Sequence, residues 1–380
     1  MVNTDYSIDI ASFDRLLQGG GESGMVLLDA RNALASQRWR PEGPGVQTFV
    51  NVPYDEFVED QDAALARVPE ATPLYVMCAR GITSQYVTGV LRERGRNAIN
   101  VAGGMTAWAA YHRTVRLNDS NDTFAIYQIA RPAKGCLSYV VSANGEALVV
   151  DASRYDDFYQ EFAERHHLRI AGVADTHLHA DHISGGAQLS RDAGSGYHLG
   201  DEDARGSALR YDAMPKKFEI GGASVAVLTL PVPGHTLGST ALLVNDRYLI
   251  SGDTLLPEGV GRPDLGNKAH EWTQYLYDSL SGVLGKLNPQ TVVLPAHAAS
   301  AAQFDSRGAI ERRLGDLLQA AAIGDRDAFI ATVEERVAQS KQPAAYAEIR
   351  KINLGEAAPE EKKQELEIGM NQCALASAKV

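Results

Sequence analysis

The sequence predicts an α/β domain, then a larger domain rich in strands, then a helical C-terminal extension. With 380 residues, the chain is long enough for two or three domains that each bury their own core. The spacing of apolar residues changes twice along the chain. At first, short apolar runs alternate with segments of helical spacing. Strand-like runs dominate from about residue 120, and helical spacing returns after about residue 305. We therefore expect domains at residues 1–115 and 120–305, with an extension at 306–380.

The first domain is expected to contain a parallel sheet. Short apolar runs at Met25–Arg31 and Pro73–Ala79 end in polar loops, as buried strands do. The segment "SQYVTGVLRERG" has helical spacing and stops at Gly95. Strands that alternate with helices are typical of a parallel α/β sheet. A polar stretch without apolar periodicity, residues 113–121, is the expected linker to the second domain.

The second domain is expected to be built around β-hairpins. In "LSYVVSANGEALVVD" and "TALLVNDRYLIS", the turns "ANGE" and "VNDR" separate apolar strands. After it, "AIERRLGDLLQAAAIGDRDAFIATVEERVAQS" has the spacing of helices. This predicts the helical extension.

Composition excludes several classes of partner. The formal net charge of −12 argues against a nucleic-acid backbone, which requires clustered Lys and Arg. We expect no membrane span, because no apolar run is long enough. The N-terminus lacks a signal-peptide pattern, so a cytoplasmic location is expected. Three cysteines without paired spacing suit a reducing compartment, and Cys136 and Cys373 are interpreted as small packing residues.

A metal centre is predicted from one dense stretch and three later residues. The stretch "DTHLHADHISGG", Asp175 to Gly186, places three histidines and two aspartates within eight residues. His235, Asp253 and His297 each follow a strand-like run further along. A strand that ends in a loop can hold an imidazole or a carboxylate rigidly and leave one face open, as a catalytic metal requires.

The motifs "HLHADH", "PGHT", "SGDT" and "PAH" resemble, in this order, the ligand motifs of the metallo-β-lactamase superfamily. The resemblance spans roughly residues 122–300. It implies an αββα sandwich with the metal at one edge. This superfamily carries out many reactions, so the fold alone does not name the chemistry.

The resemblance implies two alternative ligand sets. In the first, two zinc ions share a hydroxide and suit hydrolysis, as in the glyoxalase II thioesterases. In the second, a single Fe(II) is held by two imidazoles and one carboxylate, the facial triad of ferrous oxygenases, with positions left for substrate and O2. The zinc set comprises His177, His179, His235 and Asp253 for one ion, and Asp181, His182, Asp253 and His297 for the other. The iron set comprises His177, His235 and Asp253, with His179, Asp181, His182 and His297 around it.

The segment "GVGRPDLG", Gly259 to Gly266, favours the iron set. It resembles the Gly-Arg-x-Asp element of the persulfide dioxygenases of this superfamily, with Arg262 and Asp264 in the matching positions. An arginine beside the metal can pair with a carboxylate or with developing negative charge on oxygen. We therefore predict catalytic roles for Arg262 and Asp264.

The first domain carries a reactive-cysteine motif. "CARGITSQ", with "LLDAR" before it and "VAGGMTAW" after it, resembles a rhodanese domain over roughly residues 6–113. A cysteine in a tight loop that leads into a helix lies among backbone N–H groups, which lower its pKa and can hold an anionic persulfide. Cys78 is the predicted nucleophile, and the expected persulfide loop is Ala79, Arg80, Gly81, Ile82, Thr83 and Ser84.

The match to the rhodanese pattern is incomplete in two places. Thr83 stands where the common loop has an arginine, which puts the charge preference for the sulfur donor in question. The usual Gly-His-Ile element is replaced by "RWRPEGPGVQTFVNVP". A weakened or shifted donor specificity follows from these departures.

The resemblances together imply an α/β rhodanese domain followed by an αββα metallo-β-lactamase sandwich. The expected function is a mononuclear Fe(II) persulfide dioxygenase that uses O2 to oxidise a small thiol persulfide, such as glutathione persulfide, to sulfite. Cys78 would carry sulfane sulfur from thiosulfate or another donor. "YDSL" at 277–280 and "INLG" at 352–355 extend the resemblance into the tail. Such fusions often pair, so we expect a homodimer.

Two alternatives remain open. One is a dinuclear zinc thioester hydrolase of the glyoxalase II type with an accessory rhodanese domain. The other makes the rhodanese domain an inactive docking module. Metal content and oxygen uptake separate the first alternative from the dioxygenase, and a Cys78→Ser variant tests the second.

Overall fold

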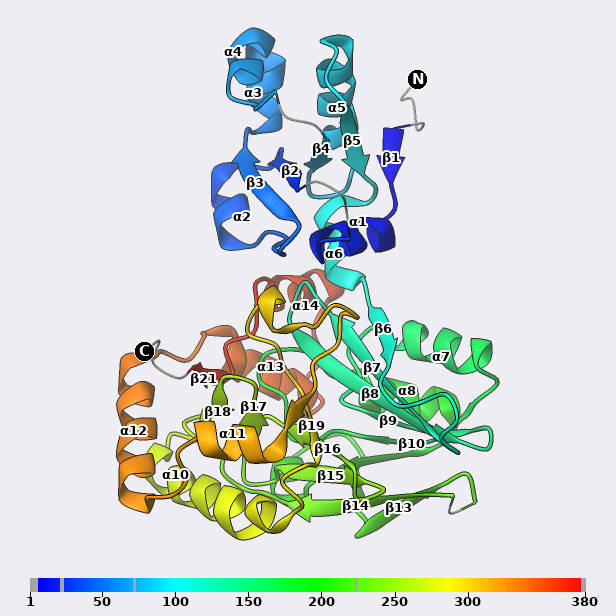
Figure 1. Cartoon of the computed structure of the whole chain (residues 1–380), viewed down its shortest axis with the longest axis vertical. Helices are drawn as coiled ribbons and strands as arrows, with labels where there is room; N and C mark the ends of the chain where they lie inside the picture. The colour runs from blue at the N-terminus through cyan, green and yellow to red at the C-terminus, as the bar shows by residue number, and fades with distance from the viewer. Residues whose placement is uncertain (1–5, 21–23, 71–72, 223, 377–380) are drawn as a thin grey trace.

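The computed structural model describes all residues except 1–5, 21–23, 71–72, 223 and 377–380. Figure 1 shows a smaller N-terminal domain at the top and a larger domain below it, with helix α14 (Glu360–Leu366) between them. No helix in the described part of the chain has both the length and the apolar character needed to cross a membrane.

The N-terminal domain is an α/β domain with a parallel sheet, as predicted. Its five strands lie in the order β1-β5-β4-β2-β3, and every pair is parallel. Helix α5 follows β4 and ends just before Gly95, whose φ of +76° favours glycine. The strands are β1 (Ser7–Ile8), β2 (Met25–Asp29), β3 (Val46–Asn51), β4 (Leu74–Met77) and β5 (Ala98–Val101). The helices are α1 (Ile10–Leu17), α2 (Ala33–Arg38), α3 (Tyr54–Glu59), α4 (Gln61–Ala66), α5 (Thr83–Glu93) and α6 (Gly104–Ala110).

The larger domain is built on two sheets of seven and six strands. The first has the order β12-β11-β10-β9-β8-β7-β6 and the second β13-β14-β15-β16-β19-β20. The first contains β6 (Arg113–Arg116), β7 (Ala125–Arg131), β8 (Cys136–Ala143), β9 (Glu146–Val150), β10 (Arg169–Ala174), β11 (Gly196–Leu199) and β12 (Asp212–Ala213). The second contains β13 (Lys217–Ile220), β14 (Val225–Pro231), β15 (Thr240–Val244), β16 (Tyr248–Gly252), β19 (Val292–Pro295) and β20 (Arg312–Arg313).

Helices cover both outer faces of this pair of sheets. The main core lies between the sheets and includes Ile126, Val141, Leu242 and Leu294. Helices α7 (Asp156–Arg165) and α8 (Gly186–Ala193) pack on the first sheet. Helices α10 (Ala269–Asp278), α11 (Leu314–Ala320) and α12 (Arg326–Gln339) pack on the second. The predicted αββα sandwich is therefore confirmed, and Figure 1 shows its layers.

The remaining elements are short or belong to the extension. They are α9 (Asp201–Ala204), β17 (Leu255–Leu256), β18 (Gly259–Gly261), the π-helix η2 (Ser279–Val283), the 3-10 helices η3 (Leu284–Lys286) and η4 (Ala301–Gln303), α13 (Ala345–Asn353) and β21 (Ala374–Ala376). After α14 the chain returns to the larger domain, where β21 pairs with β18. The extension is thus mainly helical, as predicted, but it also contributes β20 to the six-stranded sheet, and its last described element is the strand β21.

The predicted hairpins are present. β8 and β9 flank the "ANGE" turn, and β15 and β16 flank the "VNDR" turn, both as antiparallel pairs. Asn144, Asn245 and Asp246 all have positive φ, which these tight turns require.

The predicted linker at 113–121 is wrong in its first part. Arg113–Arg116 forms β6, the edge strand of the seven-stranded sheet, paired antiparallel with β7. An edge strand tolerates charged side chains, so its sequence lacks the apolar alternation of a central strand. The Arg113 guanidinium donates two 2.9 Å hydrogen bonds to Asp14 of the N-terminal domain. The domains are therefore joined by a paired strand.

Candidate metal centre and cysteine loop

The predicted ligands lie at the ends of strands in the sandwich. His177 follows β10, His235 follows β14, Asp253 follows β16 and His297 follows β19. Gly252 lets two of these loops meet: its φ is +56°, and a Cβ there would lie 2.7 Å from the Thr176 hydroxyl. A larger residue would push the Asp253 loop away from the His177 loop.

Three of these side chains form one compact group. The Asp253 Oδ2 atom lies 3.7 Å from His177 Nε2 and 3.5 Å from His235 Nε2. All three atoms are buried, and none has a hydrogen-bond partner among the described residues. Two ligands bound to one metal at about 2.1 Å lie roughly 3.0–3.4 Å apart. The donor set and its unpartnered atoms therefore fit a metal ion.

The hydrogen bonds of the ring Nδ1 atoms orient both histidines. His177 Nδ1 lies 2.9 Å from the Thr176 hydroxyl, which itself donates to Asp151, so the ring nitrogen is the donor. His235 Nδ1 donates to the Arg262 carbonyl oxygen at 2.9 Å. Each ring thus keeps its proton on Nδ1 and presents the lone pair of Nε2 to the group. Burial lowers the pKa of both histidines, which keeps them neutral, the form that binds metal.

His179 is held by a different carboxylate. Its Nε2 lies 3.1 Å from Asp151 Oδ1, and its Nδ1 has no hydrogen-bond partner among the described residues. Asp151, Asp175 and His179 form a second buried group, in which Asp175 accepts a 2.6 Å hydrogen bond from Tyr197. The ring of His179 still packs beside that of His177, with 4.3 Å between centroids.

The other predicted residues form a third buried group, which includes a cysteine. Cys136, Asp181, His182 and His297 each offer a ligand atom within 4.8 Å of the others. Asp181 contacts His182 Nδ1 at 3.3 Å, and its Oδ2 lies 3.4 Å from Cys136 Sγ. His297 Nδ1 lies 2.5 Å from Asp253 Oδ1 and connects this group to the first. The interpretation of Cys136 as an apolar filler is therefore wrong, because it faces a carboxylate and two imidazoles.

The C-terminal extension fixes the histidine loop at three points. Asn353 donates 2.9 Å hydrogen bonds to the carbonyl oxygens of His179 and His182. Glu367 accepts a hydrogen bond from the Ile183 backbone N–H, and Asn371 donates to Asp181 Oδ2 at 2.7 Å. Sequence reasoning missed all three residues. Among them, only Asn353 lies in a segment already noted in the sequence: "INLG", which resembles a segment of the rhodanese and metallo-β-lactamase fusion proteins.

Arg262 acts on the site through its backbone. Its guanidinium is 2% exposed and makes a bidentate pair with Asp264, at 2.7 and 2.9 Å. Burial raises the pKa of Asp264, but the contact with Arg262 outweighs this and lowers it, so the carboxylate is charged. The structure thus brings the two predicted residues together, and Arg262 orients His235 through its carbonyl oxygen.

Cys78 lies in a tight loop between β4 and α5. Its Sγ accepts hydrogen bonds from the Gly81 N–H at 3.1 Å and the Ser84 hydroxyl at 3.2 Å. Burial raises the pKa of this thiol, but the donors of the loop, including Ser84 and Thr83, outweigh burial and lower it. These contacts stabilise a thiolate.

Close packing against α6 holds this loop in place. Gly81 has a φ of +79°, and a Cβ there would lie 2.5 Å from the Gly103 nitrogen. The carbonyl oxygens of Cys78 and Ala79 accept hydrogen bonds from the start of α6. Within the loop, the Ile82 side chain is 69% exposed, and Arg80 also faces solvent.

Comparison with known proteins agrees with this architecture. A model of the metallo-beta-lactamase superfamily matches residues 131–297, and a model of the rhodanese-like domain matches residues 11–111. A hydroxyacylglutathione hydrolase from Anaeromyxobacter dehalogenans (strain 2CP-C) is 32% identical over 211 residues, which cover 52% of this chain and 78% of the relative. The chain belongs to the metallo-β-lactamase superfamily and carries a rhodanese-like domain on its N-terminal side.

Two solved structures are similar to the larger part of the chain. A metallo-beta-lactamase from Staphylococcus aureus subsp. aureus COL is 20% identical, covers 64% of this chain and 72% of its own, and has a TM-score of 0.50. This likeness shows the fold. ETHE1 from Myxococcus xanthus is 24% identical, covers 64% of this chain and 99% of its own, and has a TM-score of 0.48.

Proposed function

We propose that this protein is an iron-dependent persulfide dioxygenase whose N-terminal domain transfers sulfane sulfur. The observation that supports it most directly is the group of His177, His235 and Asp253. Three donor atoms converge without hydrogen-bond partners, and two imidazoles with one carboxylate are the ligands of a ferrous facial triad. Bound iron would supply open positions at which a persulfide sulfur and O2 can meet.

The proposed reaction consumes one O2 and one water for each persulfide. The sulfur–sulfur bond breaks, the thiol is released, and the outer sulfur leaves as sulfite while O2 is reduced. In this reaction, Thr176 and the Arg262 carbonyl keep the two imidazoles oriented. The bidentate pair of Arg262 and Asp264 holds the loop that carries this carbonyl.

In the N-terminal domain, Cys78 is the proposed sulfur carrier. Its thiolate attacks the outer sulfur of thiosulfate, the sulfur–sulfur bond of thiosulfate breaks, and sulfite leaves. The persulfide that forms keeps its negative charge among the donors of the loop. A small thiol then takes the sulfur and becomes the substrate of the metal centre.

A dinuclear zinc thioester hydrolase is the second candidate. It is supported by the group around Asp181 and by the relative named hydroxyacylglutathione hydrolase. Against it, part of this group is already engaged, because Asp181 Oδ2 accepts from Asn371 and His297 Nδ1 bonds to Asp253. The Nε2 atoms of His182 and His297 have no hydrogen-bond partner among the described residues. A second metal would have to replace some of the bonds to Asn371 and Asp253.

Metal analysis combined with oxygen uptake separates the two candidates. Protein purified without added metal should hold about one iron per chain and consume O2 when given glutathione persulfide. Two zinc ions per chain, no oxygen uptake and hydrolysis of a glutathione thioester would overturn the proposal in favour of the hydrolase.

A further inference from the structure

A cavity of about 590 Å³ lies where the N-terminal domain, the larger domain and α14 meet. The N-terminal domain contributes Ala79, which follows the reactive cysteine, and Thr106 of α6. The larger domain contributes Arg131 and Arg154, and α14 contributes Glu361. Its volume is within the range of sites that bind small molecules.

The cavity opens at the carboxyl ends of the parallel strands, where α/β domains bind their ligands. Residues that follow β2, among them Arg31 and Arg38, line it together with Ala79, which follows β4. The Ala79 carbonyl oxygen accepts hydrogen bonds from both the backbone N–H and the hydroxyl of Thr106. Ala79, next to Cys78, is therefore the residue of this loop that lines the cavity.

One N–H group of a buried arginine in this wall lacks an acceptor. Arg131 has a side chain that is 2% exposed, donates from Nε to the Ala109 carbonyl oxygen at 2.7 Å, and pairs through Nη2 with Glu367 at 2.9 Å. Its Nη1 has no hydrogen-bond partner among the described residues. A buried donor left unpaired destabilises the protein, so a ligand that offers an acceptor would stabilise this site.

Two further charges at the cavity are unmatched. Neither Arg38 nor Glu361 has an ion pair or a hydrogen bond from its side chain within the part of the chain that the structure describes. A cation and a carboxylate in one cavity suit a ligand that carries both signs of charge. Arginine pairs preferentially with carboxylates.

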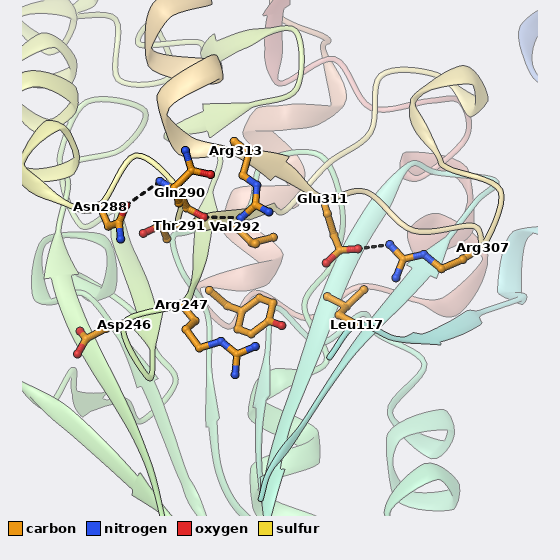
Figure 2. A pocket seen from close by; sticks show the side chains of 11 residues that line it. Leu117, Asp246, Arg247, Asn288, Gln290, Thr291, Val292, Arg307, Glu311 and Arg313 are labelled. Carbon is orange, nitrogen blue, oxygen red and sulfur yellow. Dashed lines mark hydrogen bonds and ion pairs between the residues drawn. The ribbon is translucent and has the colours of Figure 1, made fainter. Parts of the chain in front are cut away.

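In a second cavity, in the larger domain, the arginines of the lining all have partners. Figure 2 shows this space of about 520 Å³. Arg307 pairs with Glu311, Arg313 donates to the Gln290 carbonyl oxygen, and Arg247 pairs with Asp122 outside the lining. Two of these cations are thus paired with carboxylates and the third donates to a carbonyl oxygen, so the residues that line this cavity leave no buried donor unpaired within the described part of the chain.

We propose that the cavity between the domains binds the sulfur acceptor, a zwitterionic peptide thiol with carboxylate groups. This inference rests on the proposed role of Cys78 as a sulfur carrier. Arg131 and Arg38 bind the carboxylates, and Glu361 binds the ammonium group. The acceptor thiolate attacks the outer sulfur of the Cys78 persulfide, that sulfur–sulfur bond breaks, and the Cys78 thiolate leaves. A new sulfur–sulfur bond forms on the acceptor without net oxidation.

An adjoining cavity shares part of its lining with this site. It has a volume of about 570 Å³ and shares Arg38, Trp39 and Ile368 with the first. Tyr346 and Gln372 line it, and Gln372 directly follows Asn371, which bonds to Asp181. An acceptor loaded at the first cavity thus has a neighbouring space, and one residue of its lining is next in sequence to a residue that bonds to Asp181.

Binding can be measured without sulfur chemistry by using S-methylglutathione, which cannot accept sulfur. Titration calorimetry should give a Kd that rises about threefold to tenfold in Arg38→Ala, and further in Arg38→Glu. The matched control is Arg94→Ala, another exposed arginine of the same domain, which pairs with Asp62 and should leave the Kd unchanged. Arg38 is exposed, so its replacement leaves folding intact, whereas Arg131 holds the buried ion pair.

Sulfur transfer from thiosulfate provides the second measurement. Arg38→Ala should raise the KM for glutathione by a similar factor, and leave transfer to cyanide and 2-mercaptoethanol unchanged because neither acceptor has a carboxylate. Equal Kd and KM values in all variants would overturn the proposed acceptor site. If no acceptor receives sulfur but Arg38→Ala still weakens S-methylglutathione binding, the site is supported and the carrier role of Cys78 fails.

Discussion

The two reactive centres of this protein differ in how much of the chain they require. The Cys78 centre is built from one loop and the start of α6, Cys78 to Thr106, within a single domain. The proposed metal centre would take ligands from His177, His235 and Asp253, on three separate loops, and the tail fixes the histidine loop. The first centre follows from local backbone geometry, whereas the second depends on sheet register and on contacts across the whole sandwich.

The comparison predicts that each centre can be removed without the other. Cys78→Ser replaces the thiolate nucleophile with a hydroxyl and should reduce thiosulfate transfer at least about 1000-fold. Metal content and oxygen uptake with glutathione persulfide should stay at the wild-type level. Unchanged sulfur transfer would instead support the docking-module interpretation of the N-terminal domain.

A substitution in the metal group should have the opposite effect: metal content and oxygen uptake are lost, and sulfur transfer is kept. Asp253→Ala removes the carboxylate that lies between His177 and His235, so metal content should fall to near zero. Oxygen uptake should fall by more than about 100-fold. Even the replacement of residues that only hydrogen-bond to metal ligands typically lowers metal affinity or activity by about 10–100-fold. Atomic absorption and an oxygen electrode measure both effects. Loss of thiosulfate transfer in the same variant would show that the two centres are coupled.

Removing the charge of one buried carboxylate should weaken the link between the C-terminal tail and the sandwich. Glu367 pairs with Arg131 and Arg154, and Glu367→Gln would leave these cations without their counter-charge. We expect the free energy of unfolding at pH 7 to fall by about 3 kcal/mol. Urea denaturation measures this, and Glu365→Gln, an exposed neighbour on α14, is the control.

The same carboxylate gives a pH dependence with a defined sign. Burial would raise the pKa of Glu367, but the two guanidinium groups outweigh it and lower the pKa to about 2, from an ordinary value of 4.5. Its stabilisation is therefore complete above pH 4.5 and is lost as the pH falls toward 2. The difference between wild type and Glu367→Gln should shrink over this window. A difference that stays constant from pH 6 to pH 3 would contradict the assignment.

The smallest effect is expected within the cysteine loop. Ser84→Ala removes one of the hydrogen bonds that lower the pKa of Cys78, so this pKa should rise. The rate of alkylation by iodoacetamide, followed against pH, reports this value. The single proton of the Ser84 hydroxyl is shared between Cys78 Sγ and Asn100 Oδ1, which lies 2.6 Å away. Asn100→Ala removes the competing acceptor and should lower the pKa of Cys78.

Sequence patterns predicted most of the fold because their signals are local. The parallel sheet, the helix that ends before Gly95 and the two hairpins each follow from a few neighbouring residues. The motif resemblance also provided the ligand candidates in order. Their grouping was left open, because it depends on which strand ends meet.

The missed features are those whose partners lie far away in the chain. Glu367 and Arg131 are 236 residues apart, and nothing in either neighbourhood indicates the other. Cys136 was misjudged because a cysteine at the start of a strand resembles packing until its neighbours, Asp181 and His297, are known. β6 was missed because a charged edge strand looks like a polar linker.

The bonds from Asn353 and Asn371 to the histidine loop also set the order of events during synthesis. These contacts span 174 and 190 residues, and a nascent chain emerges from the ribosome N-terminal end first. The cysteine domain can fold early. The histidine loop cannot form its bonds to Asn353 and Asn371 until these residues have been translated. The candidate metal centre is thus completed late, after the cysteine domain is already formed.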